Sequence, residues 1–545
     1  MNPIQQFVRW EAEKPEAIFL QQPLAGVWKK WTYRQAGQEI RSMATALAER
    51  GLPPRSRVGI LSKNCAHWIM ADLAIWMAGH ISVPLYPTFT GNTIAQILEH
   101  SETKILFVGK LDTWEDQKAG IPTGVACIGF STYLKTPFPA WEDLVTTHPP
   151  LKEFASWTAD ELATLKYTSG TTGNPKGVML NFGAFQFVMK EGLNAIDVKP
   201  GDNNRLFSYL PLSHVAERSL VEMTALYSAS TIYFSESLET FGANLAEAQP
   251  TIFLAVPRIW AKFREKILEA MPQPKLDKLL KIPLVNLLVK RAIKKKLGLA
   301  KCKWVISGAA PVAPELLRWF QKLDIIIRDT YGMTENLAFS HINLNKVKIG
   351  TVGHVWPGIQ WRLSEQGELQ MKHPGLMMGY YKDEALTNTV LTNDGYLKTG
   401  DKGEVDREGF FTITGRIKDQ FKTDKGKFVD PTPIEMQLLQ NPDIDQACVV
   451  GMGIPQPIAL INLSAAGKSK SKDAIRDSIA QTLEHVNPSL ESYEKLEAAV
   501  IMQRDWTVEN GMLTPSMKLK RNELEKANLE KYPVWYKMKT AVVWE

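Results

Sequence analysis

The stretch from Val58 to Val108 decides the fold. It contains three short apolar runs, VGIL (58–61), ISVPL (81–85) and KILFV (104–108). Between them lie AHWIMADLAIWMA (66–78), which Gly79 closes, and a segment that Asn92 can cap as a helix through His100. Apolar runs separated by single helices predict parallel strands joined by right-handed crossovers. We therefore expect a layered α/β fold.

The same alternation returns later in the chain and then changes. TIFLA (251–255) and the run 304–306 each precede a helical stretch, whereas 351–415 holds short runs between Gly, Asp and Asn, typical of hairpins. Beyond Arg416, a charge-free strand pair lies within 446–467, and helical stretches lie near 472–486 and 518–531. We expect a large N-terminal domain over 1–415, made of layered α/β subdomains and a β subdomain at about 351–415. A small mobile α+β domain would follow over 416–545.

Composition excludes several classes of protein. With 545 residues, of which 44% are hydrophobic and 22% charged, the chain is too apolar for disorder and long enough for several packed domains. An excess of 6 positive charges, spread over so large a chain, does not indicate a nucleic-acid partner. Four cysteines without paired spacing favour a reducing compartment. The sequence shows neither a signal peptide nor a spanning helix, so we expect a cytoplasmic location.

The stretch most informative about chemistry is YTSGTTGNPKGVML (167–180), between the strand-like runs ATLKY and VML. Its glycines let backbone N–H groups turn toward an anion, its hydroxyls add donors and its lysine adds charge, which suits a polyphosphate. It is no Walker loop, since Gly follows the lysine. The alternative is a polar hairpin, but such turns seldom combine so many anion donors. The residues concerned are Thr168, Ser169, Gly170, Thr171, Thr172, Gly173, Lys176 and Gly177.

With this loop the sequence resembles the adenylate-forming enzymes, which include acyl-CoA synthetases, luciferases and peptide-synthetase adenylation domains. Further motifs of that family occur in the expected order along essentially the whole chain. They are YLPLSHVAER (209–218), VPRIW (256–260), SGAAPV (307–312), DTYGMTE (329–335), YLKTGD (396–401), GRIKD (415–419) and LTPSMKLKR (513–521). Several ordered motifs are stronger evidence than one loop.

The resemblance assigns roles around ATP. Gly308, Ala309 and Ala310 would line one face of adenine, and Asp329 would meet its exocyclic amine. In DTYGMTE, Gly332 permits a tight turn, Tyr331 offers a flat face to the purine, Thr334 supplies a phosphate donor and Glu335 a magnesium ligand. Taken alone, Thr334 and Glu335 would be better interpreted as the solvent-exposed start of a helix than as ligands of phosphate and magnesium.

Two further assignments concern ribose and the acid. Asp401 and Arg416 would bind the ribose hydroxyls, although a lone Asp in a Thr-Gly-Asp turn is more often structural. His214, in a helix-entry segment, would position the substrate carboxylate without acid–base chemistry. By itself it would read as a core or cap histidine.

The resemblance also assigns a catalytic lysine and a hinge. Lys518 is the expected catalytic lysine, with Lys520 as the alternative, because Met517 stands where the family usually has glycine. On the residues alone, this basic cluster would be a solvated helix start. Lys418 would be the hinge of the small domain, and Gly426 would approach the coenzyme A thiol.

Together these features imply an ATP-dependent acyl-CoA ligase that uses Mg²⁺ and takes coenzyme A as a substrate. LPLSHVAER and FKTDKGKFVDPTPIE (421–435) are closest to long-chain fatty acyl-CoA synthetases. The partners would be a small-molecule carboxylic acid, ATP and coenzyme A. Three alternatives stay open: an acyl-AMP ligase that delivers to a carrier protein, a luciferase-like oxygenase, and a non-catalytic nucleotide-binding relative. These motifs do not indicate the oligomeric state.

One segment is not explained by the motifs. From 275 to 303 the chain reads KLDKLLKIPLVNLLVKRAIKKKLGLAKCK, an apolar series joined to a basic cluster. Such a segment can lie peripherally on an anionic membrane, here on its inner face. A domain helix with one buried and one solvated face fits the pattern equally well.

Overall fold

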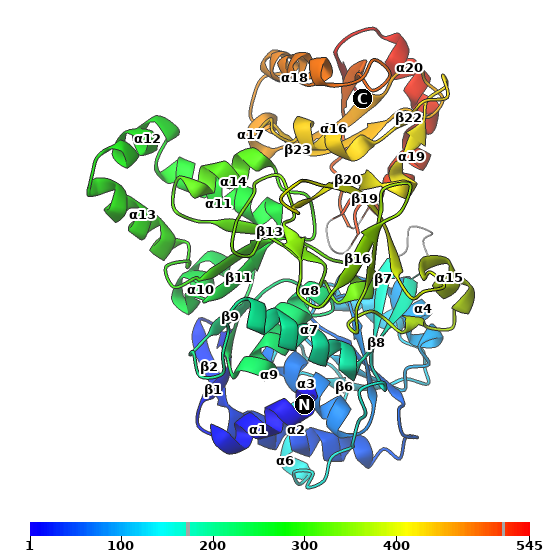
Figure 1. Ribbon diagram of the computed structural model, residues 1–545. Helices are drawn as coiled ribbons and strands as arrows, with labels where there is room; N and C mark the ends of the chain where they lie inside the picture. Colours follow the sequence, from blue (N-terminus) through cyan, green and yellow to red (C-terminus); the bar gives the residue numbers. More distant parts are fainter. Residues whose placement is uncertain (170–174, 509, 515–517) are drawn as a thin grey trace.

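The computed structural model describes the whole chain except residues 170–174, 509 and 515–517. Figure 1 shows a large body, built by the chain up to β20, and a smaller unit built by the residues that follow. The α-helices of the described part are α1 (Pro3–Glu13), α2 (Tyr33–Ala48), α3 (Ala66–Met77), α4 (Gly91–His100), α5 (Trp114–Gln117), α6 (Trp141–Thr147), α7 (Phe182–Ala195), α8 (Val215–Glu217), α9 (Thr224–Ser228), α10 (Phe241–Ala248), α11 (Pro257–Ala270), α12 (Gln273–Lys281), α13 (Val285–Lys296), α14 (Pro314–Gln321), α15 (Glu384–Val390), α16 (Pro431–Leu438), α17 (Ala465–Lys468), α18 (Lys472–Val486), α19 (Arg521–Asn528) and α20 (Tyr532–Lys537).

The first sheet has the strand order β18-β8-β7-β4-β3-β5-β6. Its strands are β3 (Arg57–Leu61), β4 (Ile81–Leu85), β5 (Ile105–Val108), β6 (Ala126–Gly129), β7 (Leu162–Ser169), β8 (Pro175–Asn181) and β18 (Gly379–Tyr380). β3 to β6 pair in parallel, as the alternation of 58–108 predicts, and β7 and β8 form an antiparallel hairpin. The hairpin therefore holds the two ends of the glycine-rich loop side by side.

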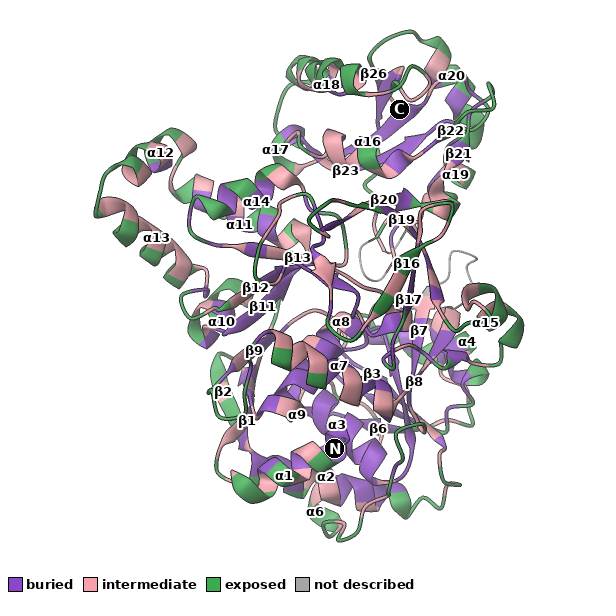
Figure 2. Ribbon diagram, viewed as in Figure 1, coloured by how far each residue is buried: buried purple, intermediate pink, exposed green. Residues whose placement is uncertain are grey.

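Helix α3 forms the centre of the large body. Every residue from Ala66 to Met77 is buried, including Asp72, and Figure 2 shows this helix deep inside the molecule. A helix that is apolar on all faces must be covered on all sides, which fixes α3 between neighbouring layers. The predicted helix over 66–78 is confirmed. Helix α4, in contrast, is capped by the Thr90 hydroxyl and not by Asn92, so the predicted cap is wrong by two residues.

The second sheet runs in the order β15-β14-β13-β12-β11-β9-β10-β1-β2. Its strands are β1 (Ile18–Leu24), β2 (Val27–Thr32), β9 (Arg205–Ser208), β10 (Thr231–Phe234), β11 (Ile252–Ala255), β12 (Trp304–Ser307), β13 (Ile327–Tyr331), β14 (His341–Ile342) and β15 (His354–Val355). β9 to β13 pair in parallel, and the predicted strands at 251–255 and 304–306 lie among them.

The third sheet contains β16 (Gln360–Leu363), β17 (Glu368–Lys372), β19 (Leu397–Val405) and β20 (Phe411–Arg416), all antiparallel. These hairpins agree with the pattern of short runs between Gly, Asp and Asn over 351–415. The same stretch also sends β15 and β18 into the other two sheets and contains helix α15, so it is less self-contained than the sequence indicates. The Gly and Asn residues there mark connections between sheets as well as turns within one.

The small unit begins after β20 with the short pair β21 (Phe421–Lys422) and β22 (Phe428–Val429). Its main sheet is β23 (Ile444–Val450), β24 (Ile458–Leu463), β25 (Ala498–Ile501) and β26 (Val542–Trp544). Alternate residues of β23 serve two cores: Ala447 and Val449 pack toward α16 and α18, whereas Cys448 and Val450 pack toward α19 and α20. Helices on both faces make this unit a domain with its own core, and the predicted fold class is confirmed.

The large and small domains touch through a few polar contacts. Arg258 in α11 pairs with Asp445 at 3.0 Å, and Lys402 in β19 lies 3.9 Å from Asp430. Gly415 permits the approach at this junction, since a Cβ there would lie 2.0 Å from Asp430 Oδ1. Among the described residues, no helix is long and apolar enough to cross a bilayer.

Candidate active site

Sheet topology brings the two nucleotide motifs of the central region together. Ser307, the last residue of β12, is in register with Asp329 of the parallel strand β13. The loop that starts at Gly308 therefore leaves the sheet beside the DTYGMTE segment, at the edge where parallel strands present ligand sites. Gly308 is needed here because a Cβ would lie 2.8 Å from Thr330 Cγ2, and Ala309 has a positive φ of 67°. Gly308, Ala309 and Ala310 thus lie beside the DTYGMTE segment, and their contact with adenine stays a prediction.

Asp329 lies at the same edge, largely enclosed by protein. The amide of Thr330 donates to its Oδ1 at 3.0 Å. Burial raises the pKa of this carboxyl well above its ordinary value. In either protonation state the side chain keeps an acceptor oxygen, which an exocyclic amine requires.

Asp401 joins Tyr331 and Arg416 in one network. Asp401 lies in the middle of β19, in register with Arg416 of β20, so it is held by strand pairing and not by the turn expected from its Thr-Gly-Asp context. The Arg416 Nε donates to Asp401 Oδ1 at 2.6 Å, and the Tyr331 hydroxyl donates to Asp401 Oδ2. The charge of Asp401 raises the pKa of Arg416, and burial together with Asp401 raises the pKa of Tyr331. This network presents a fixed carboxylate and a fixed guanidinium.

Glu335 lies one turn beyond Tyr331 in the 3₁₀ segment Thr334–Asn336. Gly332, in between, has no room for a side chain, since a Cβ there would lie 2.4 Å from the backbone of Ala338. The Tyr380 hydroxyl donates to Glu335 Oε1 at 2.8 Å, and burial and Glu335 both raise the pKa of Tyr380. The bond orients the Glu335 carboxylate.

Tyr380 also connects Glu335 to the glycine-rich loop. The Lys176 ammonium lies 5.8 Å from the centre of the Tyr380 ring, within the range of a cation–π contact. Lys176 is in register with Thr168 across the β7–β8 hairpin, so both ends of the loop are fixed close to Tyr380. The predicted residues Gly170, Thr171, Thr172 and Gly173 lie outside the described residues, and Ser169 is described only as the end of β7.

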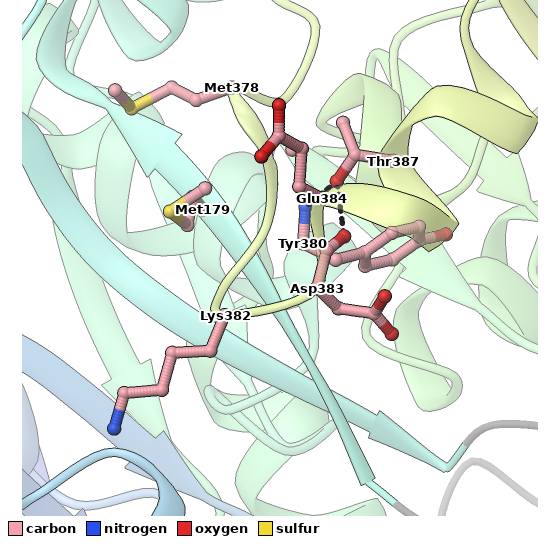
Figure 3. A pocket seen from close by; sticks show the side chains of 8 residues that line it. Met179, Met378, Tyr380, Lys382, Asp383, Glu384 and Thr387 are labelled. Atoms are coloured by element: carbon pink, nitrogen blue, oxygen red, sulfur yellow. Dashed lines mark hydrogen bonds between the residues drawn. The ribbon is translucent and has the colours of Figure 1, made fainter.

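A pocket of about 480 Å³ lies beside Tyr380. Figure 3 shows its lining side chains, which come from β8, β18 and the start of α15, with the Tyr380 amide donating to the Thr387 hydroxyl at 2.9 Å. Tyr380 is the one member of this lining that also contacts Glu335. None of the site residues predicted from the sequence lines it, so the pocket is distinct from the place where those residues meet.

His214 is the cap residue of α8. Its Nδ1 accepts the amide of Ala216 at 3.2 Å, which makes Nε2 the protonated nitrogen in the neutral ring. Burial, with Lys518 and Lys166 nearby, lowers the pKa of His214 to about 3. The ring is therefore neutral at physiological pH and can donate one hydrogen bond. Tyr86 packs edge-on to it, with ring centres 6.5 Å apart.

Lys166 is a buried amine that sequence reasoning misses. It lies on β7, 2% exposed, with its Nζ 3.5 Å from the carbonyl oxygen of Leu212. Burial lowers its pKa well below the ordinary value. The segment that carries His214 is further fixed by Arg218, whose guanidinium pairs with buried Asp72 and, at 3.1 Å, with Glu222. The lysine stands within a strand-like run, so no local signal distinguishes it from a solvent-facing strand residue.

Lys518 is the residue that joins the small domain to this site. It is exposed, and desolvation together with Arg416 lowers its pKa. Asp401 and Glu335 act in the opposite direction. Lys518 is thus close enough to interact electrostatically with Arg416, Asp401 and Glu335 of the large domain. Lys520, the alternative, instead caps α19, which begins at Arg521 and not at 518 as predicted.

Two predicted residues lie away from this group. Lys418 is exposed in the 3₁₀ turn Ile417–Asp419, directly after Arg416, where the chain leaves β20. Gly426 lies in the turn between β21 and β22 with φ of 76°, and its amide donates to the carbonyl of Thr423 at 2.9 Å. The contacts that the structure gives this turn are within the small domain.

The assembled group can hold a nucleoside triphosphate and an acid. It offers Thr168 and Lys176 on one side, a carboxylate–guanidinium pair on another, the Glu335 carboxylate, and a neutral histidine close to Lys518. No group of three or more His, Cys, Asp or Glu side chains within the described ranges could cage a metal alone. Magnesium commonly binds one or two carboxylates together with substrate phosphates, so Glu335 fits it in that form.

Comparison with known proteins agrees with this geometry. Residues 7–381 match the AMP-binding enzyme family, and residues 418–531 match the C-terminal domain of AMP-binding enzymes. The long-chain-fatty-acid–CoA ligase FadD15 of Mycobacterium bovis is 31% identical over 561 residues, which cover 94% of this chain and 93% of that protein. The long-chain-fatty-acid–CoA ligase ACSBG2 of Xenopus laevis is 28% identical, covering 93% and 80%.

Solved structures show the same fold. An anthranilate CoA ligase in complex with anthranoyl-AMP superposes with a TM-score of 0.79 at 19% identity, covering 97% of both chains. The adenylation domain of a carboxylic acid reductase from Segniliparus rugosus, in complex with AMP and a carboxylic acid, gives 0.80 at 21% identity, covering 99% and 94%. The present chain belongs to the AMP-binding enzyme family.

Proposed function

We propose that this member of the AMP-binding enzyme family is an ATP-dependent acyl-CoA ligase that activates fatty acids, with long-chain acids as the expected class. The observation that carries the proposal is the position of Lys518. A lysine of the small domain lies in the field of Glu335, Asp401 and Arg416 of the large domain, which supports a cation contributed to the site by the small domain. The names of the curated relatives support the fatty-acid class.

In the first half-reaction, a carboxylate oxygen of the acid bonds to the α-phosphorus of ATP. The bond from that phosphorus to the bridging oxygen breaks, and pyrophosphate leaves with the electron pair. Charge builds on the phosphoryl oxygens, so cations placed there lower the barrier. Lys518 and Lys176 supply such cations, and Glu335 would hold the Mg²⁺ that neutralises the phosphates. The nucleotide is kept in place by Asp401 and Arg416 at the ribose and by Asp329 at the adenine.

His214 positions the acid. Its neutral ring donates from Nε2, which can hold a carboxylate without removing the negative charge that makes it a nucleophile. Lys166 and Tyr86 lie beside the ring and fix its surroundings. The acyl chain then extends away from the phosphates.

In the second half-reaction, the sulfur of coenzyme A bonds to the acyl carbon, the bond from that carbon to the AMP oxygen breaks, and the thiol proton is released. Lys518 must withdraw, because the pantetheine arm needs a path to the acyl group. A rotation about Lys418, the exposed residue where the chain leaves β20, would withdraw Lys518 and bring the Gly426 turn toward the thiol. The proposed domain boundary therefore lies at 415/416.

A screen of acids tests the proposal. The protein is incubated with MgATP and acids from acetate to oleate, with and without coenzyme A, and pyrophosphate and acyl-CoA are measured separately. Pyrophosphate release that peaks with long-chain acids, together with acyl-CoA only when coenzyme A is present, is the expected result. Release without acyl-CoA, but with transfer to a loaded carrier protein, would identify a carrier ligase instead. No acid-dependent release at any chain length would overturn the proposal.

A further inference from the structure

Helices α12 and α13 form a hairpin that projects from the side of the large domain (Figure 1). Its base is anchored. Leu276 is buried, Val289 and Ile293 pack against the core around β11 to β13, and the Trp319 indole donates to Gln273 at 2.8 Å. The hairpin is thus a packed helical projection with one face toward the body, and what remains to be explained is its other face.

The outward face of α13 is apolar at one end and basic at the other. Val289 and Ile293, four residues apart, define the inward stripe. Leu287, Leu288, Arg291 and Lys295 occupy the opposite side at helical spacing. Leu287 is 59% exposed and Leu288 66%, and no residue of α13 is buried. Figure 2 shows α13 in the colours of intermediate and exposed residues along its length.

The tip of the hairpin continues this apolar end. Ile282 is 46% exposed and Leu284 is 76% exposed, and Leu284 has a φ of 66°, a conformation that bulky side chains rarely adopt. With Leu287 and Leu288, these residues form one exposed apolar tip over 282–288. Contiguous exposed apolar side chains of this kind mark an interaction surface.

Charge distribution identifies the partner. Residues 273–296 contain eight Lys and Arg and a single acid, Asp277, for a net charge of +7. The whole chain carries +6, so the rest of it carries −1. The excess is therefore concentrated in the hairpin and not spread as the composition suggested. Lys290 pairs with Asp324 at 3.0 Å; the other seven bases of the hairpin have no ion pair with any described acid.

We propose that the hairpin docks this protein on an anionic lipid bilayer. The tip over 282–288 would enter the boundary between headgroups and acyl chains, and the basic residues behind it would contact anionic headgroups. A second copy of the same hairpin is a poor occupant, since a symmetric contact would oppose two strongly positive surfaces. The helices are too short to span, so the protein lies on the surface. This inference is independent of the proposed function.

Vesicle cosedimentation of the full-length protein, without nucleotide or acid, tests the docking. Mixed phosphatidylglycerol–phosphatidylcholine vesicles should bind the protein at low salt, and pure phosphatidylcholine vesicles should bind it far less. Leu287→Ser/Leu288→Ser should weaken binding by about tenfold or more, because two buried leucines are lost. Arg291→Glu/Lys295→Glu should weaken it by a similar factor, and raised salt should weaken wild-type binding.

A matched control changes the same charge elsewhere. Arg50→Glu/Lys152→Glu alters two exposed bases outside the hairpin, with the same net change, and should bind almost as wild type does. Melting temperatures of all variants show that they are folded. Absence of binding to anionic vesicles at low salt, or equal losses in the control and hairpin variants, would overturn the proposal. So would a dimer in sedimentation that Leu287→Ser/Leu288→Ser dissociates, because the tip would then bind a second copy.

Discussion

Removing the charge of Lys518 should separate the two half-reactions. The side chain is exposed. Desolvation and Arg416 lower its pKa, whereas Asp401 and Glu335 act in the opposite direction. A unit charge about 4 Å from a phosphoryl oxygen is worth about 1 kcal/mol in water and about 4 kcal/mol at an effective dielectric constant of about 20. With ATP filling the site, the upper part of that range applies. Lys518→Ala should therefore slow adenylation by about 10²- to 10³-fold.

The neighbouring lysine is the matched control. Lys520 is the N-cap residue of α19 and makes no side-chain cap bond there, so Lys520→Ala should change adenylation by less than about threefold. Adenylation is measured as acid-dependent pyrophosphate release, and thioester formation is measured from purified acyl-AMP and coenzyme A. Lys518→Ala should keep the second rate. The reasoning is refuted if Lys520→Ala is the more damaging variant, or if Lys518→Ala loses both rates equally while remaining folded.

Three further predictions concern the metal, the hinge and the histidine. Glu335→Gln should raise the Mg²⁺ concentration needed for half-maximal pyrophosphate release by about tenfold or more, because a charged ligand is lost; an unchanged requirement would remove that role. If the present arrangement is the adenylating one, Lys418→Pro should retain adenylation and block thioester formation, because a 3₁₀ turn has the φ that proline fixes; loss of adenylation alone would contradict this. His214→Asn should reduce the loss of folding stability as the pH falls. The unfolded histidine takes up a proton near its ordinary pKa of 6.5 and the folded one near about 3, so wild type should lose about 1.4 kcal/mol per pH unit more than the variant between about pH 6 and pH 4, measured by denaturant melts.

Much of the fold could be predicted from periodicity alone. The strands β3, β4 and β5 and the helix α18 occur within a residue or so of their predicted ranges, because each is a run of apolar or periodic residues bounded by turn signals. Errors occurred where two local signals competed. Thr90 and Asn92 can both cap a helix, and the backbone selects Thr90. The basic run from Lys518 could begin a helix, but α19 starts at Arg521.

The sequence motifs indicated candidate site residues but not the residues that orient them. The partners that orient them are distant in sequence and leave no local trace. Tyr380 reaches Glu335 across 45 residues, and Lys166 reaches Leu212 across 46. Asp401 illustrates the limit best, since its sequence context predicts a turn whereas strand register places it opposite Arg416. Residue types suggested the chemistry that we propose, and the pairing of strands supplied the geometry of the residues around it.

The measurement that tests the central claim most directly follows the carboxylate oxygen. Oleate labelled with heavy oxygen in its carboxylate is converted with MgATP and coenzyme A, and the products are analysed by mass spectrometry. If the acid attacks the α-phosphorus and the thiol then attacks the acyl carbon, AMP carries one labelled oxygen and the thioester carries the other. Unlabelled AMP, or label in pyrophosphate or phosphate, would contradict an acyl-adenylate intermediate.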